Sequence, residues 1–307
     1  MTDDNIATVR LLLDIAPTVF RSKLFAMKGG TALNLFVQDM PRLSVDIDVV
    51  FVDHLASRDL ALQSIGAELR HIQQELQVRG LAVRLPPNAN GDEIKLTVEG
   101  EEAKVKVEVN IVFRGTVLPV QIQPLTPGAQ DLFTTSVAVP VLQVEELYGS
   151  KLVAAMDRQH PRDIFDVMHM LRTVGWTTPV VDCFVAYLAG HNRPVHEVLF
   201  GPAKPLDAVF KREFVGMTRE DVPLDWLLQT QAALRHELPR RLEMRHREFL
   251  LSLVRGAPDW VLMPYTHMQD LPAVRWKLKN LLVLKSRNRG RFEDQGAQLE
   301  AGFEALN

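Results

Sequence analysis

Apolar residues recur at helical spacing in many parts of the chain, separated by glycine and proline. In the first half, this spacing predicts helices at 5–20 and at 56–79, the second of which ends at Gly80. After Val144 the same period predicts helices along most of the remaining chain. These helices are expected at 144–157, 162–173, 178–189, 222–234, 239–254, 273–286 and 293–305.

Strict alternation of apolar and polar residues predicts strands, and it is confined to the first half. A short apolar strand at 24–27 leads through a glycine turn into a helix, and residues 43–52 alternate as a second strand. Residues 81–141 show short alternating runs typical of hairpins, most clearly at 104–113. The pattern predicts an α+β protein, with a mixed-sheet domain at 1–142 and a mainly helical domain at 143–307.

Composition supports a two-domain protein and excludes several classes of site. The chain has 307 residues, 47% of them hydrophobic, and one cysteine, Cys183. A single cysteine allows neither an internal disulfide nor a cysteine-rich zinc site, and its apolar neighbours indicate a core position. No zincin or serine hydrolase motif is present, and no apolar run reaches about 18 residues. Because the acidic N-terminus also does not resemble a leader peptide, we expect a soluble cytoplasmic protein with no membrane partner.

Charge is distributed unevenly between the two halves. Residues 1–200 hold 18 basic and 24 acidic side chains, whereas residues 201–307 hold 17 and 14. Residues 275–291 contain no carboxylate, which indicates either a solvated helix face or contact with a polyanion. The candidate RNA-binding cations in this basic segment are Arg275, Lys277, Lys279, Lys285, Arg287 and Arg289, followed by Arg291. A second group of candidates lies at Arg240, Arg241, Arg245 and Arg247.

Two short motifs combine into a candidate nucleotide site. Gly29-Gly30-Thr31 lies at a helix start, where backbone N–H groups and the helix dipole favour a phosphate. Asp46 and Asp48 lie on one face of the following strand, about 7 Å apart, where they could share a divalent cation. Glu108, on the polar face of its own strand, is the best candidate for a third ligand of Mg²⁺ or Mn²⁺.

Each motif alone is more often structural than functional. A Gly-Gly pair before a helix is usually a tight turn, and an Asp-x-Asp pair is usually a solvated strand end. The order strand, Gly-Gly-Thr, helix and Asp-x-Asp strand is nevertheless the layout of nucleotidyltransferases of the polymerase β type. We therefore expect the amino-terminal domain to have that fold.

Longer strings resemble one family within this superfamily. Met27 to Leu33 and Arg42 to Asp48 are similar to the first motif of the AbiEii/AbiGii nucleotidyltransferase toxins, which include the MenT toxins. Leu147 to Ala155 and Pro161 to Val167 resemble that family's later lysine and aspartate motifs, and Trp276 to Leu281 resembles its C-terminal region.

The resemblance implies roles for individual residues. Asp46 and Asp48 would be catalytic metal ligands, and Ser44 would lie where it could touch a phosphate. Lys151 would hold the triphosphate, with Asp163 and Asp166 as the late acidic residues of the active site. The implied nucleotide-binding residues are Lys28, Gly29, Gly30, Thr31, Ser44 and Lys151.

Structural alternatives for the later motif remain open. On its own helix Lys151 is flanked by apolar residues, so a snorkelling lysine is the simplest alternative. Asp163 lies near a helix start where an acidic residue complements the dipole, and sequence does not show whether Asp163 or Asp166 faces the active site.

The resemblance implies a toxin of a toxin–antitoxin or phage-defence system, with a cognate antitoxin encoded nearby. Its reaction would be Mg²⁺-dependent transfer of nucleotides from an NTP to RNA, with the 3′ end of tRNA as the expected acceptor and a block of translation as the result. No DNA partner is expected. The alternatives are a non-catalytic nucleotide- or RNA-binding protein of the same fold, and transfer to a protein hydroxyl or a small molecule.

Overall fold

The computed structural model describes residues 3–87, 89–92 and 94–306. The chain divides into two compact units. The first contains Met1–Leu147 together with Val215–Asp221, and the second contains Tyr148–Phe214 together with Val222–Asn307. The division falls inside a helix that begins at Val144, just after the position at which the sequence analysis places the domain boundary.

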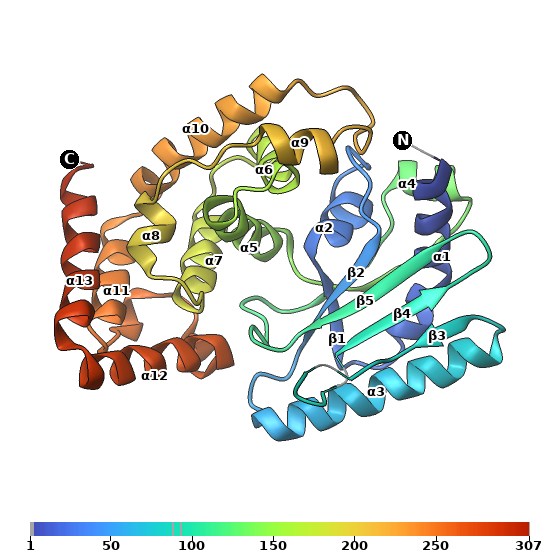
Figure 1. Cartoon of the computed structure of the whole chain (residues 1–307), viewed down its shortest axis with the longest axis horizontal. Helices are drawn as coiled ribbons and strands as arrows, with labels where there is room; N and C mark the ends of the chain where they lie inside the picture. The colour runs from blue at the N-terminus through green and yellow to red at the C-terminus, as the bar shows by residue number, and fades with distance from the viewer. Residues whose placement is uncertain (1–2, 88, 93, 307) are drawn as a thin grey trace. The chain divides into compact units, whose positions relative to one another are not determined.

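A mixed seven-stranded sheet forms the centre of the first unit, in the order β3-β4-β5-β2-β1-β7-β6 (Figure 1). β2 runs parallel to β5, and β1 runs parallel to β7, while the other neighbours are antiparallel. The strands are β1 Phe25–Lys28, β2 Asp46–Phe51, β3 Ala82–Arg84, β4 Lys95–Glu99, β5 Lys104–Asn110, β6 Gln121–Pro124 and β7 Ala138–Val141.

Two long helices pack on this sheet, α1 Asp3–Val19 and α3 Arg58–Val78. They contact each other as well as the strands, and Figure 1 shows α3 running along the sheet beside β3 and β4. Apolar residues spaced by three or four along α3, such as Ile65, Leu69 and Ile72, are fully buried, as the helical period predicts. The alternation of β5 is also confirmed, because its valines are buried and its lysines exposed.

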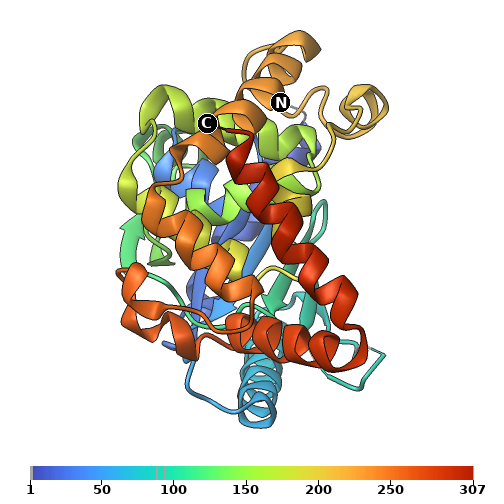
Figure 2. The same cartoon turned by 90° about the vertical axis from the view of Figure 1, so that its left-hand side faces the viewer.

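Helices fill the second unit, beginning in α5 Val144–Asp157. Among the described residues they continue as α6 Pro161–Thr173, α7 Thr178–Ala189, α8 Val195–Phe200, α9 Asp207–Glu213, α10 Leu224–Arg241, α11 Met244–Val254, α12 Pro272–Arg287 and α13 Arg289–Glu304, with short 3₁₀ turns η2 Trp260–Leu262 and η3 Thr266–Asp270. Figure 2 shows α11 and α13 side by side, with α12 adjoining α13. No helix in the described part of the chain is long and apolar enough to cross a membrane.

α7 lies at the centre of this unit, and Cys183 is one of its fully buried residues. A Cβ atom added to Gly149 of α5 would lie 2.6 Å from the Cβ atom of Cys183, so these two helices meet without room for a side chain at Gly149. The expectation of a core cysteine is confirmed.

Three features differ from the sequence-based expectation. The short helices α8, α9 and α4 Pro127–Phe133 were not predicted, because six or seven residues are too few to establish a period. A break was predicted before Pro239, but α10 continues to Arg241, since Leu238 and Pro239 are buried and packing outweighs the one backbone bond that proline removes. After the glycine turn the backbone forms η1 Ala32–Val37, a π-helix rather than an α-helix.

Candidate active site

The glycine turn between β1 and η1 is packed directly against the Asp-x-Asp strand. α2 Gly29–Thr31 begins with Gly29 at φ +75°, a left-handed conformation that favours glycine. A Cβ atom on Gly29 would overlap the carboxylate of Asp48, and one on Gly30 would lie 2.8 Å from Ser44 Oγ. Both glycines therefore allow the turn to approach Ser44 and Asp48 more closely than any other residue could.

Strand register brings several polar side chains onto one face of the sheet. Lys28 of β1 is the register partner of Asp48, and Asp48 is the register partner of Glu108 on β5. Asp46 precedes Asp48 by two residues, so its side chain lies on the same face. Both aspartates are partly accessible, whereas Ile47 and Val49 between and beyond them are buried.

Glu108 is oriented by a neighbouring strand. Its carboxylate forms an ion pair with Lys95 of β4, which is its register partner on that side. Among the described residues, no three histidine, cysteine, aspartate or glutamate side chains form a group that could hold a metal ion. The register supports a shared face for Glu108, Asp46 and Asp48, while the role of Glu108 as a third ligand stays a prediction.

Hydrogen bonds from the turn reach the strand and the loop before it. Thr31 is fully buried, and its Oγ1 donates to the carbonyl of Asp46 at 2.5 Å. Asn34 Nδ2 donates to the carbonyl of Gly30 at 2.8 Å. The hydroxyl of Thr31 thus ties the turn to the Asp-x-Asp strand.

Arg42 is a part of this site that sequence reasoning missed. It is only 2% exposed, its Nη1 donates to the carbonyl of Leu43 at 3.0 Å, and its Nη2 lies 2.8 Å from the Cβ position of Gly30. A buried guanidinium thus adds positive charge next to the glycine turn. Arg42 is the first residue of the Arg42 to Asp48 motif, but arginine is usually a surface residue, so no pattern in the sequence indicated its burial.

The loop that carries Arg42 is held by the segment Val215–Asp221. Leu43 N donates to the carbonyl of Met217, and Arg219 N donates to the carbonyl of Pro41, both at 3.0 Å. These bonds flank an antiparallel bridge between Arg42 and Thr218. A segment distant in sequence therefore fixes the backbone immediately before Ser44 and Asp46.

In the second unit, the later motif forms a buried ion cluster. Lys151 Nζ lies 3.0 Å from Asp163 Oδ1 and 3.0 Å from Asp166 Oδ2, and all three side chains are buried. Burial alone would raise the pKa of Asp163, but Lys151 and Arg158 beside it hold that pKa well below its usual range. Two carboxylates from α6 flank Lys151 and its side chain is buried, so the alternative of a lysine that snorkels to solvent is wrong.

Not every cation of the basic segment reaches the surface. Arg275, Lys279, Lys285 and Arg287 of α12 are exposed. Lys277 is 6% exposed, its Nζ donates to the carbonyl of Arg193 at 2.6 Å, and burial lowers its pKa to about 8. The expectation that Lys277 contacts RNA is therefore wrong, because its position on the inner face of α12 directs it into the protein.

Other candidate cations bind partners within the protein. Arg289 forms an ion pair with Glu293 at 2.7 Å, on the surface of α13. Arg245 forms ion pairs with Asp182 and Glu243, and its neighbour His246 contacts the same Asp182 at 2.6 Å. Arg245 thus joins α7 to α11, which argues against the role in RNA binding that its place in a basic group suggested.

Comparisons with known proteins agree with this arrangement. Residues 10–280 match the family described as nucleotidyl transferase AbiEii toxin, type IV toxin–antitoxin system. No curated protein matches the chain significantly. The structure is similar to that of MenT4, a nucleotidyltransferase toxin from Mycobacterium tuberculosis H37Rv, with a TM-score of 0.58 at 18% sequence identity, over 90% of this chain and 91% of that one.

The family match spans most of the chain, including the glycine turn, the Asp-x-Asp strand and the Lys151 cluster. The structural similarity confirms the predicted α+β fold with its helical C-terminal part. The chain belongs to the AbiEii family of nucleotidyltransferase toxins.

Proposed function

We propose that this toxin transfers nucleotides from an NTP to an RNA acceptor, with the 3′ end of tRNA as the expected acceptor, in a reaction that requires a divalent cation. The observation that carries the proposal is the packing of Gly29 and Gly30 against Asp48 and Ser44. It places the backbone suited to a phosphate beside the carboxylates suited to a cation.

The residues present fit Mg²⁺. This ion is usually bound through one or two carboxylates together with substrate phosphates and water, and Asp46 and Asp48 supply two carboxylates on one strand face. When bound, the cation would neutralise phosphate charge and favour the ionised form of the attacking hydroxyl. Glu108 is proposed as a further ligand, for which its ion pair with Lys95 would have to open.

The chain's own groups would position the NTP. Backbone N–H groups of the glycine turn would donate to the phosphate oxygens, and the buried charge of Arg42 would reduce their repulsion of the nearby carboxylates. Transfer forms a bond between the acceptor oxygen and the α-phosphorus, and it breaks the bond from that phosphorus to the departing pyrophosphate. Lys28 and Ser44 are proposed as further phosphate contacts, and Lys151, Asp163 and Asp166 as contributors from the helical unit.

The decisive experiment tests donor, acceptor and carboxylate together. Purified protein is incubated with total tRNA, Mg²⁺ and each α-³²P-labelled NTP in turn, and the products are separated on a denaturing gel. We expect one NTP to label tRNA, and Asp46→Asn to abolish the label because the isosteric amide binds a cation poorly. Glu102→Gln, which changes an exposed carboxylate of the same unit, is the matched control.

Other outcomes would redirect the proposal. Label in a protein band instead of tRNA would favour transfer to a protein hydroxyl. Equal labelling of tRNA by the wild type and Asp46→Asn would contradict the assigned role of the aspartates. A folded protein that binds NTP but labels no acceptor would support the non-catalytic alternative.

RNA contact is assigned to the exposed cations around the end of α12, Lys285 and Arg287, with Arg291 of α13 nearby in sequence. The double change Lys285→Glu with Arg287→Glu should weaken RNA binding and reduce the salt dependence of log K by roughly 0.7 per lost phosphate contact. Binding of a labelled tRNA at several salt concentrations measures this slope. Arg10→Glu, an exposed change in the first unit, should leave it unaltered.

A further inference from the structure

The apolar side chains of α12 extend beyond the side that it buries in the helical unit. Its inner side buries Ala273, Val274 and Leu281 in the helical unit. At about 100° per residue, Leu278 lies roughly 80° and Leu282 roughly 120° from the centre of this buried side, so the apolar surface continues around the helix toward solvent. Leu282, at the outer edge of this apolar surface, is 50% exposed, so burial within this chain leaves half of its side chain uncovered.

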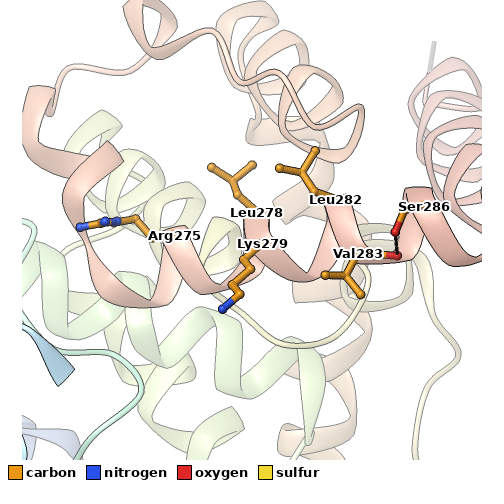
Figure 3. Close-up of a pocket in the computed structure, with 6 residues that line it drawn as sticks. All are labelled: Arg275, Leu278, Lys279, Leu282, Val283 and Ser286. Atoms are coloured by element: carbon orange, nitrogen blue, oxygen red, sulfur yellow. Dashed lines mark hydrogen bonds between the residues drawn. The ribbon is translucent and has the colours of Figure 1, made fainter. Parts of the chain in front are cut away.

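The exposed part of this apolar surface lines a shallow groove along α12. Leu282 is 50% exposed and Val283 is 39% exposed, and Leu282 also lies against Gly256 at the end of α11. Figure 3 shows Leu278 and Leu282 projecting from one edge of α12, while Lys279 and Val283 extend from the other edge and Arg275 lies toward the start of the helix. The groove has a volume of about 510 Å³ and is lined by Arg275, Leu278, Lys279, Leu282, Val283 and Ser286.

The spacing of the lining residues identifies the shape of the ligand. They stand at positions i, i+3, i+4, i+7, i+8 and i+11 of one helix, which is the seam that a second helix packs against. Adjacent aliphatic side chains offer little to a phosphate backbone, which is held by cations and hydrogen-bond donors. The groove is therefore better suited to an amphipathic helix than to RNA.

Charge identifies the chemistry of that helix. Arg275 and Lys279 border the leucines, and the whole stretch from 271 to 292 contains no carboxylate. An incoming helix with leucine or isoleucine along one side and glutamate or aspartate beside it would match both features. We propose that the groove on α12 is the docking site for an acidic amphipathic helix of a partner protein.

Binding of designed peptides tests the proposal without any nucleotide. Three fluorescein-labelled peptides of roughly three heptads are used: one with leucine at a and d flanked by glutamates, one with lysines replacing the glutamates, and a scrambled form of the first. Fluorescence anisotropy with the full-length protein should show that the acidic amphipathic peptide binds and that the other two do not. Leu282→Ala and Leu278→Ala should each weaken this binding on the order of tenfold.

Charge reversal and a matched control complete the test. Lys279→Glu should weaken binding of the acidic peptide and strengthen binding of the lysine peptide. Leu60→Ala, which removes a 54% exposed leucine from α3, should change nothing. Circular dichroism verifies that each variant is folded.

Three results would overturn the proposal. The first is equal binding of the acidic and scrambled peptides, and the second is undiminished binding of the acidic peptide to Leu282→Ala. The third is that no peptide binds, whereas a labelled RNA binds in a way that depends on Leu278 and Leu282. Because the assay contains no NTP, its failure would not affect the proposed transfer reaction, and failure of that reaction would not affect the groove.

Discussion

At the scale of single residues, Gly29 and Gly80 show that glycine can be required for two different reasons. Position 29 requires glycine both because its φ is positive and because the carboxylate of Asp48 lies beside it, whereas Gly80 has a similar φ of +85° with no atom within 4 Å of its Cβ position. Substitutions at these two positions therefore distinguish the cost of backbone strain from the cost of steric overlap.

Gly80→Ala should cost about 1–2 kcal/mol of stability, from φ strain alone. Gly29→Ala should cost more, and it should lower nucleotide transfer on the order of 100-fold because Asp48 must move. Urea denaturation and the tRNA labelling assay measure the two effects. If Gly29→Ala lost no more stability than Gly80→Ala and kept full transfer activity, the turn and Asp48 would not be coupled.

Lys151 provides a second prediction at this scale. Lys151→Met leaves Asp163 and Asp166 buried without their shared cation and should destabilise the protein by about 3–5 kcal/mol. Arg158→Ala, which removes a side chain that is 62% exposed, should cost about 1 kcal/mol or less. Thermal denaturation of both variants checks this. An inactive Lys151→Met variant of unchanged stability would instead assign Lys151 to catalysis alone.

The same cluster predicts a dependence of stability on pH. Since the pKa of Asp163 is lower in the folded protein than its unfolded value of about 3.9, its contribution is complete above that value and is lost as pH falls through the folded pKa. Stability of the wild type should therefore decline more steeply below about pH 4 than that of Asp163→Asn. Parallel declines in denaturant titrations at several pH values would contradict the assignment.

At the scale of elements, the contact between α5 and α7 depends on Gly149. Gly149→Ala would place a methyl group 2.6 Å from the Cβ atom of Cys183 and should destabilise the protein by about 1–3 kcal/mol. Gly296→Ala, in α13 with no atom within 4 Å of its Cβ position, should instead stabilise by up to about 1 kcal/mol. If the denaturation midpoints of Gly149→Ala and Gly296→Ala shifted in the same direction, this account of the helix contact would be contradicted.

The Asp-x-Asp strand is supported by neighbours on both sides and by the loop before it. β1 and β5 align Lys28 and Glu108 with Asp48, while Met217 and Arg219 hold the backbone on either side of Arg42. The Asp-x-Asp strand is thus positioned by elements from three distant parts of the sequence. Such support is what precise placement of the proposed metal-binding carboxylates requires.

At the scale of the whole molecule, membership of a toxin family predicts an effect on cells. Induced expression should arrest growth, and Asp48→Asn should relieve the arrest because it removes a carboxylate of the proposed cation site. Glu102→Gln should remain toxic at the same protein level, as measured by growth curves with immunoblots. Full toxicity of Asp48→Asn would contradict the proposal that transfer causes the arrest.

Much of this molecule could be predicted from sequence because local patterns determine it. Helical and strand periods located most of the long elements, since burial of one face imposes those periods directly. The Gly-Gly turn was recognisable because few residues other than glycine can adopt its backbone conformation. Asp46 and Asp48 were recognisable because two carboxylates two residues apart lie on one face of a strand.

Tertiary structure alone decided which side chains are engaged. Lys151, Lys277 and Arg245 each belong to a charged pattern in the sequence, yet the fold buries the first two and pairs the third with a buried aspartate. The burial of Arg42 and the return of Val215–Asp221 to the first unit also left no local signal. The physical reason is that a residue's environment depends on chain segments far away in sequence, whereas the residue types that chemistry and backbone geometry demand are visible locally.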